Sequence, residues 1–309
     1  MTAQQRRLLL VWCALTFVYS PDQADAQFTD PHNYDNAPVG VNQLEFGYAF
    51  VHGNASIDAS LAIGGANLNL NQGIIDFTHY FSLFDRVTWV GAAIPIARLA
   101  GSITGTNIEG ATSAAGDSSY AFAMLLKGGP ALSTPDFENY EPMTTLGVSI
   151  AVTAPTGSYN ADKILNLGSD RWSFKPEIAL SYPFGPDQKW QLDTYVNAYF
   201  YTNNTSYRGR EILRQEPLPG LEAHLSYSFS DSVWVSFDTR YAFRGTTFVD
   251  GIDQNNAQRN AILGSEMNVS IDSQHSLLFG IAKAIVHHNS PAVVGFSVKY
   301  DYVWGPGYK

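Results

Sequence analysis

A histidine close to a serine is the residue pair that could do covalent chemistry in this chain. His288-Asn289-Ser290 has the i, i+2 spacing that places both side chains on one face of a strand. A serine next to such a base can act as a nucleophile in ester hydrolysis. However, Pro291 follows at once, and the strand-to-helix turn that exposes a hydrolase serine is missing. We therefore predict that the protein is not an enzyme.

Metal and phosphate chemistry lack their usual spacings. His287 and His288 are adjacent, so they face opposite sides of a strand. The glycine pairs lack the Lys-Ser/Thr partner of a phosphate loop. The residues without a ligand or phosphate-loop pattern are His32, His52, His79, His224, His275, Gly64, Gly65, Gly128 and Gly129. The single cysteine is Cys13, so a thiolate metal site is excluded. We predict no metal and no cofactor.

The overall charge argues against a nucleic-acid partner. Lys and Arg number 18 against 28 acidic residues, a net charge of −10. Binding of phosphate backbones requires a basic face.

The charged residues of the chain occupy alternate positions in long predicted strands. From Trp190 to Tyr201, apolar and small residues alternate with Gln191, Asp193 and Asn197. One face then suits lipid and the other suits water. Such charges could line a lumen and filter solutes, or only brace a narrow barrel. The candidates for this lining are Arg171, Lys175, Glu177, Asp193, Glu222, Asp238, Arg240, Arg244, Glu266, Lys299 and Asp301.

Alternation of period two runs through almost the whole chain. We expect about twelve strands, an even number as in bacterial single-chain barrels. They begin near residues 42, 69, 86, 118, 144, 172, 188, 219, 232, 258, 274 and 292. Short and long connections alternate, as periplasmic turns and outer loops do. Two exceptions, a long inward connection at 129–143 and a short outward one at 287–291, leave the strand count open by two.

The fold class that we predict is all-β: an antiparallel transmembrane β-barrel with short periplasmic turns and long outer loops. Hydrophobic residues make up 45% of the chain and charged residues 15%, yet no stretch after the N-terminus is apolar for long enough to form a membrane helix. Closure removes the strand edges that hydrocarbon cannot solvate. Aromatic residues near the short turns suit an interfacial girdle: Tyr182, Phe184, Trp190, Phe229, Tyr302 and Trp304.

The N-terminus has the pattern of an export signal. Arg6 and Arg7 precede an apolar run from Leu8 to Tyr19, and Ala24-Asp25-Ala26 fits a cleavage site. We predict a signal peptide over residues 1–26, a periplasmic lead-in over 27–41 and the barrel over 42–309. The predicted location is the outer membrane of a Gram-negative bacterium.

The middle of the chain contains three closely spaced motifs: Pro155-Thr156-Gly157, Asn166-Leu167-Gly168 and Arg171-Trp172-Ser173-Phe174-Lys175-Pro176-Glu177. In these motifs the chain resembles a known outer-membrane family, the one associated with the meta-cleavage pathway of phenol degradation. The resemblance implies an exported β-barrel that takes up hydrophobic or aromatic compounds. The glycine-containing motifs could serve recognition or gating at the outer mouth, but we favour turn chemistry that stabilises a long loop. The chain departs from the expected aromatic C-terminus, since its last strand residue, Trp304, lies five residues before the end.

Together these patterns predict a porin-like transporter or channel for small hydrophobic or aromatic solutes. Its expected partners are outer-membrane lipids, those solutes and the barrel-assembly machinery, with no nucleic acid. The first alternative is a plugged structural or interaction barrel. The less favoured alternative is an outer-membrane lipase.

Overall fold

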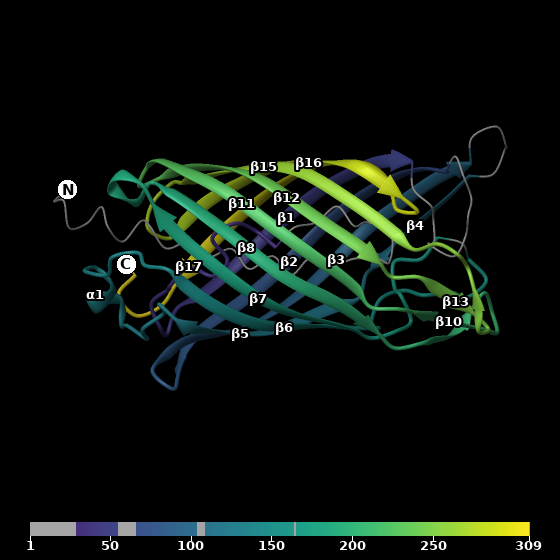
Figure 1. Cartoon of the computed structure of the whole chain (residues 1–309), viewed down its shortest axis with the longest axis horizontal. Coiled ribbons are helices and arrows are strands. Elements are labelled where there is room, and N and C mark those ends of the chain that lie inside the picture. The colour runs from purple at the N-terminus through teal and green to yellow at the C-terminus, as the bar shows by residue number, and fades with distance from the viewer. Residues whose placement is uncertain (1–28, 55–65, 104–108, 164, 309) are drawn as a thin grey trace.

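The computed structural model describes residues 29–54, 66–103, 109–163 and 165–308, and these form an almost entirely β structure (Figure 1). The main sheet contains 13 strands. Its order runs β2-β1-β17-β16-β15-β12-β11-β8-β7-β6-β5-β3-β4, and an additional pairing of β2 with β3 closes the ring. The short strand β4 (Glu109–Ala115) pairs only with the outer part of β3, and the other strands form a closed antiparallel barrel.

The strands of the ring lie where the alternation predicted them. Each observed start is within three residues of the expected one, and the largest difference is at β2, which begins at 66 rather than 69. The ring consists of β1 (Asn42–Asn54), β2 (Ala66–Leu83), β3 (Arg86–Ile103), β5 (Ser118–Lys127), β6 (Thr145–Ala154), β7 (Ser173–Phe184), β8 (Trp190–Tyr201), β11 (Leu218–Ser230), β12 (Val233–Arg244), β15 (Gln258–Ser270), β16 (His275–His288) and β17 (Ala292–Trp304). The predicted fold class is confirmed.

Both predicted exceptions to the loop pattern are present. The inward connection between β5 and β6 contains the short helix α1 (Thr134–Phe137), capped by Ser133, and the Thr134 hydroxyl donates to the Pro306 carbonyl. The outward connection between β16 and β17 is short. The two exceptions therefore do not change the number of strands.

The two ends of the barrel differ in their connections (Figure 1). At one end β2 turns directly into β3 at Phe84 and Asp85, both with positive φ, as a two-residue hairpin of the right-handed sheet twist requires. The β7–β8 turn at the same end contains the 3-10 helix η2 (Pro186–Gln188). At the other end the long loops build a small four-stranded sheet: β9 (Asn204–Tyr207), β10 (Glu211–Gln215), β13 (Thr247–Val249) and β14 (Ile252–Asp253).

The outward face of the barrel is apolar and the inward face mixed. Ile94, Ile178 and Phe237 are each more than half exposed, while Asp193 on β8 is fully buried inside. Near the short turns Tyr182 stacks on Phe184, with ring centroids 5.7 Å apart. Such a belt suits a bilayer interface. Among the described residues no helix is long and apolar enough to cross a membrane.

Candidate functional site

The inner half of the barrel is occupied by the chain's own N-terminal segment. We call residues 29–36 the plug. Asp30, Asn33 and Tyr34 are at most 3% exposed. The sequence analysis placed residues 27–41 in a periplasmic lead-in. In the structure the plug lies inside the barrel, while residues 37–41 follow its rim, where the Val39 N–H donates to Leu132 O and the Gly40 N–H to Tyr80 O. The predicted signal peptide lies outside the described residues.

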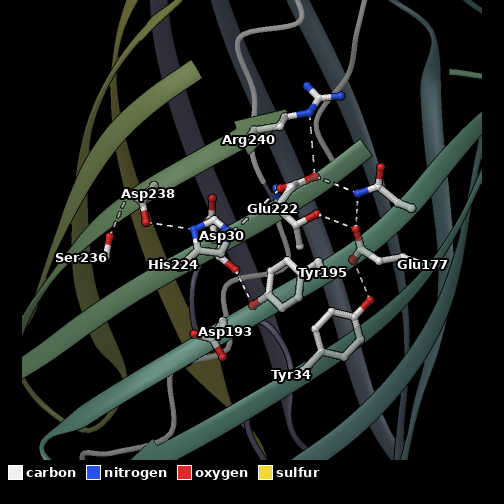
Figure 2. A network of polar contacts seen from close by, with 12 residues as sticks. Asp30, Tyr34, Glu177, Asp193, Tyr195, Glu222, His224, Ser236, Asp238 and Arg240 are labelled. Carbon is white, nitrogen blue, oxygen red and sulfur yellow. Dashed lines mark hydrogen bonds and ion pairs between the residues drawn. The ribbon is translucent and has the colours of Figure 1, made fainter. Parts of the chain in front are cut away.

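The first anchor of the plug is Thr29, which joins two lumen carboxylates. Its backbone N–H donates to Glu222 Oε2 at 2.7 Å and its hydroxyl donates to Glu177 Oε2 at 3.1 Å. Lys175 Nζ donates to the same hydroxyl at 2.7 Å and pairs with Glu177 at 3.0 Å. Asn197 Nδ2 donates to both carboxylates. Figure 2 shows Glu177 and Glu222 within this network. The carboxylates therefore have donors from two strands, β7 and β8, and from the plug.

The second anchor is His32. Its backbone N–H donates to Asp193 Oδ2 at 3.1 Å. In the ring, Nδ1 lies 2.9 Å from Asp35 Oδ2 and Nε2 lies 2.8 Å from Ser226 Oγ. The ring packs 4.6 Å from the Trp234 ring. Burial alone lowers the pKa of His32, but the Asp35, Asp193 and Asp238 carboxylates outweigh it and raise that pKa above 6.5. The docked plug therefore favours the charged imidazolium.

The third anchor is Tyr34. Its hydroxyl donates to Glu177 Oε1 at 2.8 Å and lies 2.7 Å from Ser149 Oγ. Its ring packs against Trp89 and Tyr195, with centroids 5.6 and 5.3 Å away. Burial and the Glu177 charge hold the pKa of Tyr34 well above 10.0, so the hydroxyl stays a donor. The ring fits because β6 has Gly147 here, where an added Cβ would lie 2.3 Å from Tyr34 Cδ1.

The predicted lining residues divide into two groups inside the barrel. One group belongs to the network of Figure 2 or adjoins it on β7, β8, β11 and β12: Lys175, Glu177, Asp193, Glu222, Asp238 and Arg240. There the Asp238 carboxylate lies 2.9 Å from His224 Nδ1 and accepts from Ser236, while Arg240 Nε lies 3.9 Å from Glu222 Oε1. The other group lies on β15 and β17: Glu266, Lys299 and Asp301. Lys299 Nζ binds the plug, 2.5 Å from Asp30 Oδ2.

Two predicted lining residues lie outside both groups. Arg171 precedes β7 and is buried beneath the outer loops, where it donates to Gln215 Oε1 at 2.6 Å and lies over the Tyr201 ring. Arg244 ends β12 with a positive φ, and its side chain is exposed. Arg171 braces a loop, and Arg244 does not join the inward network.

The family motifs form the turns of a loop that folds over the outer mouth. The Gly157 N–H donates to Asp117 Oδ1 at 2.7 Å, and the Ser169 N–H and hydroxyl donate to Asp117 Oδ2 at 2.8 and 2.6 Å. An added Cβ on Gly168 would lie 2.7 Å from the Gly157 backbone, so glycine permits this contact. Of the remaining motif residues, Pro155, Thr156, Asn166 and Trp172 lie in this loop, whereas Pro176 lies within β7.

The same loop inserts Leu167 into the outer half of the barrel, where the inward faces are apolar. We call this cluster the apolar collar. Leu167 is fully buried and packs with inward side chains from six strands. The collar residues are Val51, Leu68, Leu70, Ala97, Leu99, Leu167, Ile262, Ala284 and Val293. Sequence reasoning missed the collar because it expected the inward face to be polar throughout.

A pocket of about 660 Å³ opens at the short-turn end, beside the plug. Asp35 and Asn36 of the plug line it, together with residues of the α1 connection and of the β7–β8 and β11–β12 turns. The pocket marks where the plug meets the periplasmic mouth.

The residues considered for catalysis lie at the β16–β17 connection, beside Arg259 of β15. Ser290 Oγ lies 3.4 Å from the Arg259 carbonyl, and His288 is exposed at the end of β16. Within the described part of the chain, no group of three or more His, Cys, Asp or Glu residues could hold a metal ion.

Comparisons with known proteins agree with this architecture. The profile of the family described as "Putative MetA-pathway of phenol degradation" matches residues 32–300. An outer membrane channel from Pseudomonas putida F1 has a similar fold, with a TM-score of 0.77 at 22% identity over 89% of this chain and 99% of that one. The transport unit of the Escherichia coli autotransporter AIDA-I is more distant, with a TM-score of 0.54 at 9% identity over 91% and 94%. Curated protein sequences give no significant match.

Proposed function

Because the chain belongs to the MetA-pathway phenol-degradation family, we propose that it is an outer-membrane channel that passes small hydrophobic or aromatic molecules. The observation that carries this proposal is the apolar collar. In a passage for ions and sugars, buried aliphatic side chains would be an obstacle, whereas for an aromatic solute they offer favourable contacts. The similar fold of the Pseudomonas putida channel supports a barrel that conducts.

Passage requires the plug to move, and its bonding suits this. Residues 29–36 form no strand, so their departure breaks side-chain contacts but leaves the barrel's hydrogen-bond ladder intact. Cleavage after Ala26, which we also propose, leaves the plug at the start of the mature chain. A free end can withdraw toward the periplasm without unthreading. Outer-membrane lipids around the apolar band and the barrel-assembly machinery complete the proposed set of partners.

The test is uptake of a neutral aromatic solute into proteoliposomes that contain the mature chain. We expect uptake of benzyl alcohol derivatives to exceed that of sugars of similar size. Leu167→Asp, which places a charge in the collar, should lower aromatic uptake selectively. Equal uptake of both solute classes, unaffected by this substitution, would contradict the proposal.

A second candidate function is a structural or interaction barrel. The plug and the collar both place buried side chains inside the barrel, which favours this alternative. It predicts a correctly folded barrel that passes neither ions nor solutes, with or without the plug.

A further inference from the structure

Three inward carboxylates lie side by side on neighbouring strands. Strand pairing sets Glu45 of β1 opposite Asp76 of β2 on one side and opposite Asp301 of β17 on the other. We call these residues the carboxylate row. They are 1%, 3% and 2% exposed. Directly opposed side chains in a sheet lie about 5 Å apart, and like charges in such a row destabilise it.

Hydrogen-bond donors are unevenly distributed along the row. Asp301 accepts from Gln43 at 2.7 Å and from the Ser276 hydroxyl at 3.4 Å, and Asp76 Oδ1 accepts from Thr78 at 3.3 Å. Three carboxylate oxygens lack a hydrogen-bond partner among the residues that the structure describes: both oxygens of Glu45, and Oδ2 of Asp76. A buried carboxylate without a donor is costly. A positively charged group beside Glu45 would offset this cost.

The nearest ammonium does not meet this need. Lys299 projects from β17 on the same face, but its Nζ is 2.5 Å from Asp30 of the plug. The charged groups that act on Glu45 are Lys299, Asp301, Asp30 and Asp76. Glu266 of β15 adds another carboxylate close to Asp30 and Lys299. On this wall of the lumen, acidic groups clearly outnumber basic ones.

We propose that the carboxylate row binds a monovalent cation that keeps part of its water. Rows and rings of Asp and Glu attract cations in membrane pores. Since the described residues contain no cluster with the geometry of a metal site, the cation is held by charge and through water rather than by direct ligation from three side chains. This site is independent of which uncharged solute the barrel passes.

The first test is thermal unfolding of the full mature chain, which does not depend on an open lumen. Potassium chloride is compared with N-methylglucamine chloride at equal ionic strength, because the larger organic cation does not fit a narrow lumen site. We expect potassium to raise the melting midpoint by about 2 °C, the size of shift that a weakly bound ligand produces. Glu45→Gln with Asp76→Asn should abolish the difference. Asp253→Asn, an exposed outer carboxylate, should leave it unchanged.

The same variants give an independent readout where the barrel conducts. In a potassium chloride gradient, the wild-type reversal potential should show cation selectivity, and the paired Glu45→Gln and Asp76→Asn substitutions should move it toward zero. Equal melting midpoints in the two salts for the wild type would overturn the proposal, since carboxyls that are simply protonated need no cation. Failure of aromatic uptake would leave this result unaffected.

Discussion

His32 links the plug to the barrel through its charge. The groups that face it are Asp35 on the plug, Asp193 on β8 and Asp238 on β12, with Ser226 and Trp234 as uncharged neighbours. Its pKa in the docked state lies above the ordinary value of 6.5. The stabilisation that it gives the plug is therefore complete below about 6.5 and is lost as pH rises through the raised pKa.

This linkage predicts that the plug is released more readily at alkaline pH. The probability of an open channel should rise as the pH is raised above 6.5, because the neutral imidazole loses its attraction to the surrounding carboxylates. His32→Gln keeps hydrogen-bonding capacity but cannot titrate, so it should flatten this dependence. Single-channel recording at stepped pH provides the measurement. An unchanged pH profile in the variant would show that another group controls the plug.

Gly147 gives a second residue-scale prediction. Gly147→Ala places a Cβ against the Tyr34 ring, at 2.3 Å in the unrelaxed structure, and overpacking of this kind costs roughly 1–3 kcal/mol. We expect the plug to loosen and conductance to increase. Gly73→Ala is the matched control, because an added Cβ there meets its nearest atom at 3.9 Å. Wild-type conductance in both variants would contradict the role of Gly147 in seating the Tyr34 ring.

At the scale of elements, the strands were predictable and the plug was not. Each strand contains its own period-two pattern, so Trp190–Tyr201 alone shows which side chains face inward. Residues 29–36 have no periodicity. Their partners, such as Lys299, lie up to 269 positions away, so only the folded barrel reveals that they belong inside it.

The pairing register of the strands was also not predictable from the sequence. Glu45 and Asp76 were not among the predicted lining residues, although Glu45 stands between the apolar Leu44 and Phe46. Its placement beside Asp76 and Asp301 depends on the strand pairing, which a single sequence does not specify. The apolar collar was missed because Leu68 and Leu70 share their inward face with the polar Gln72 and Asp76, so that face was expected to be polar throughout.

The outer loop with the family motifs is anchored to the barrel by Asp117. Asp117 is fully buried and accepts three hydrogen bonds from Gly157 and Ser169. Asp117→Asn keeps the shape but replaces one acceptor oxygen with a donor, so we expect a loss of about 2 kcal/mol in loop anchoring. Hydrogen exchange should become faster in residues 155–163 and 165–171. Asp231→Asn, exposed at the opposite end, serves as control, and equal exchange in both variants would refute the role of Asp117.

At the scale of the whole molecule, the barrel contains two different barriers in series. The apolar collar lies toward the long loops, and the polar network with the plug lies toward the short turns. An aromatic solute would pass the first barrier by apolar contact. In the proposed function, the second would open when the plug leaves Glu222, Asp193 and Lys299.

The most direct test of this account is single-channel conductance of the refolded mature chain with and without residues 27–36. Heat-modifiable mobility on gels would confirm that both forms contain a folded barrel. We predict rare, discrete openings for the wild type, frequent openings after deletion of the plug, and block of both by an added aromatic solute. A deleted form that is folded but as silent as the wild type would contradict the claim that the plug closes a passage.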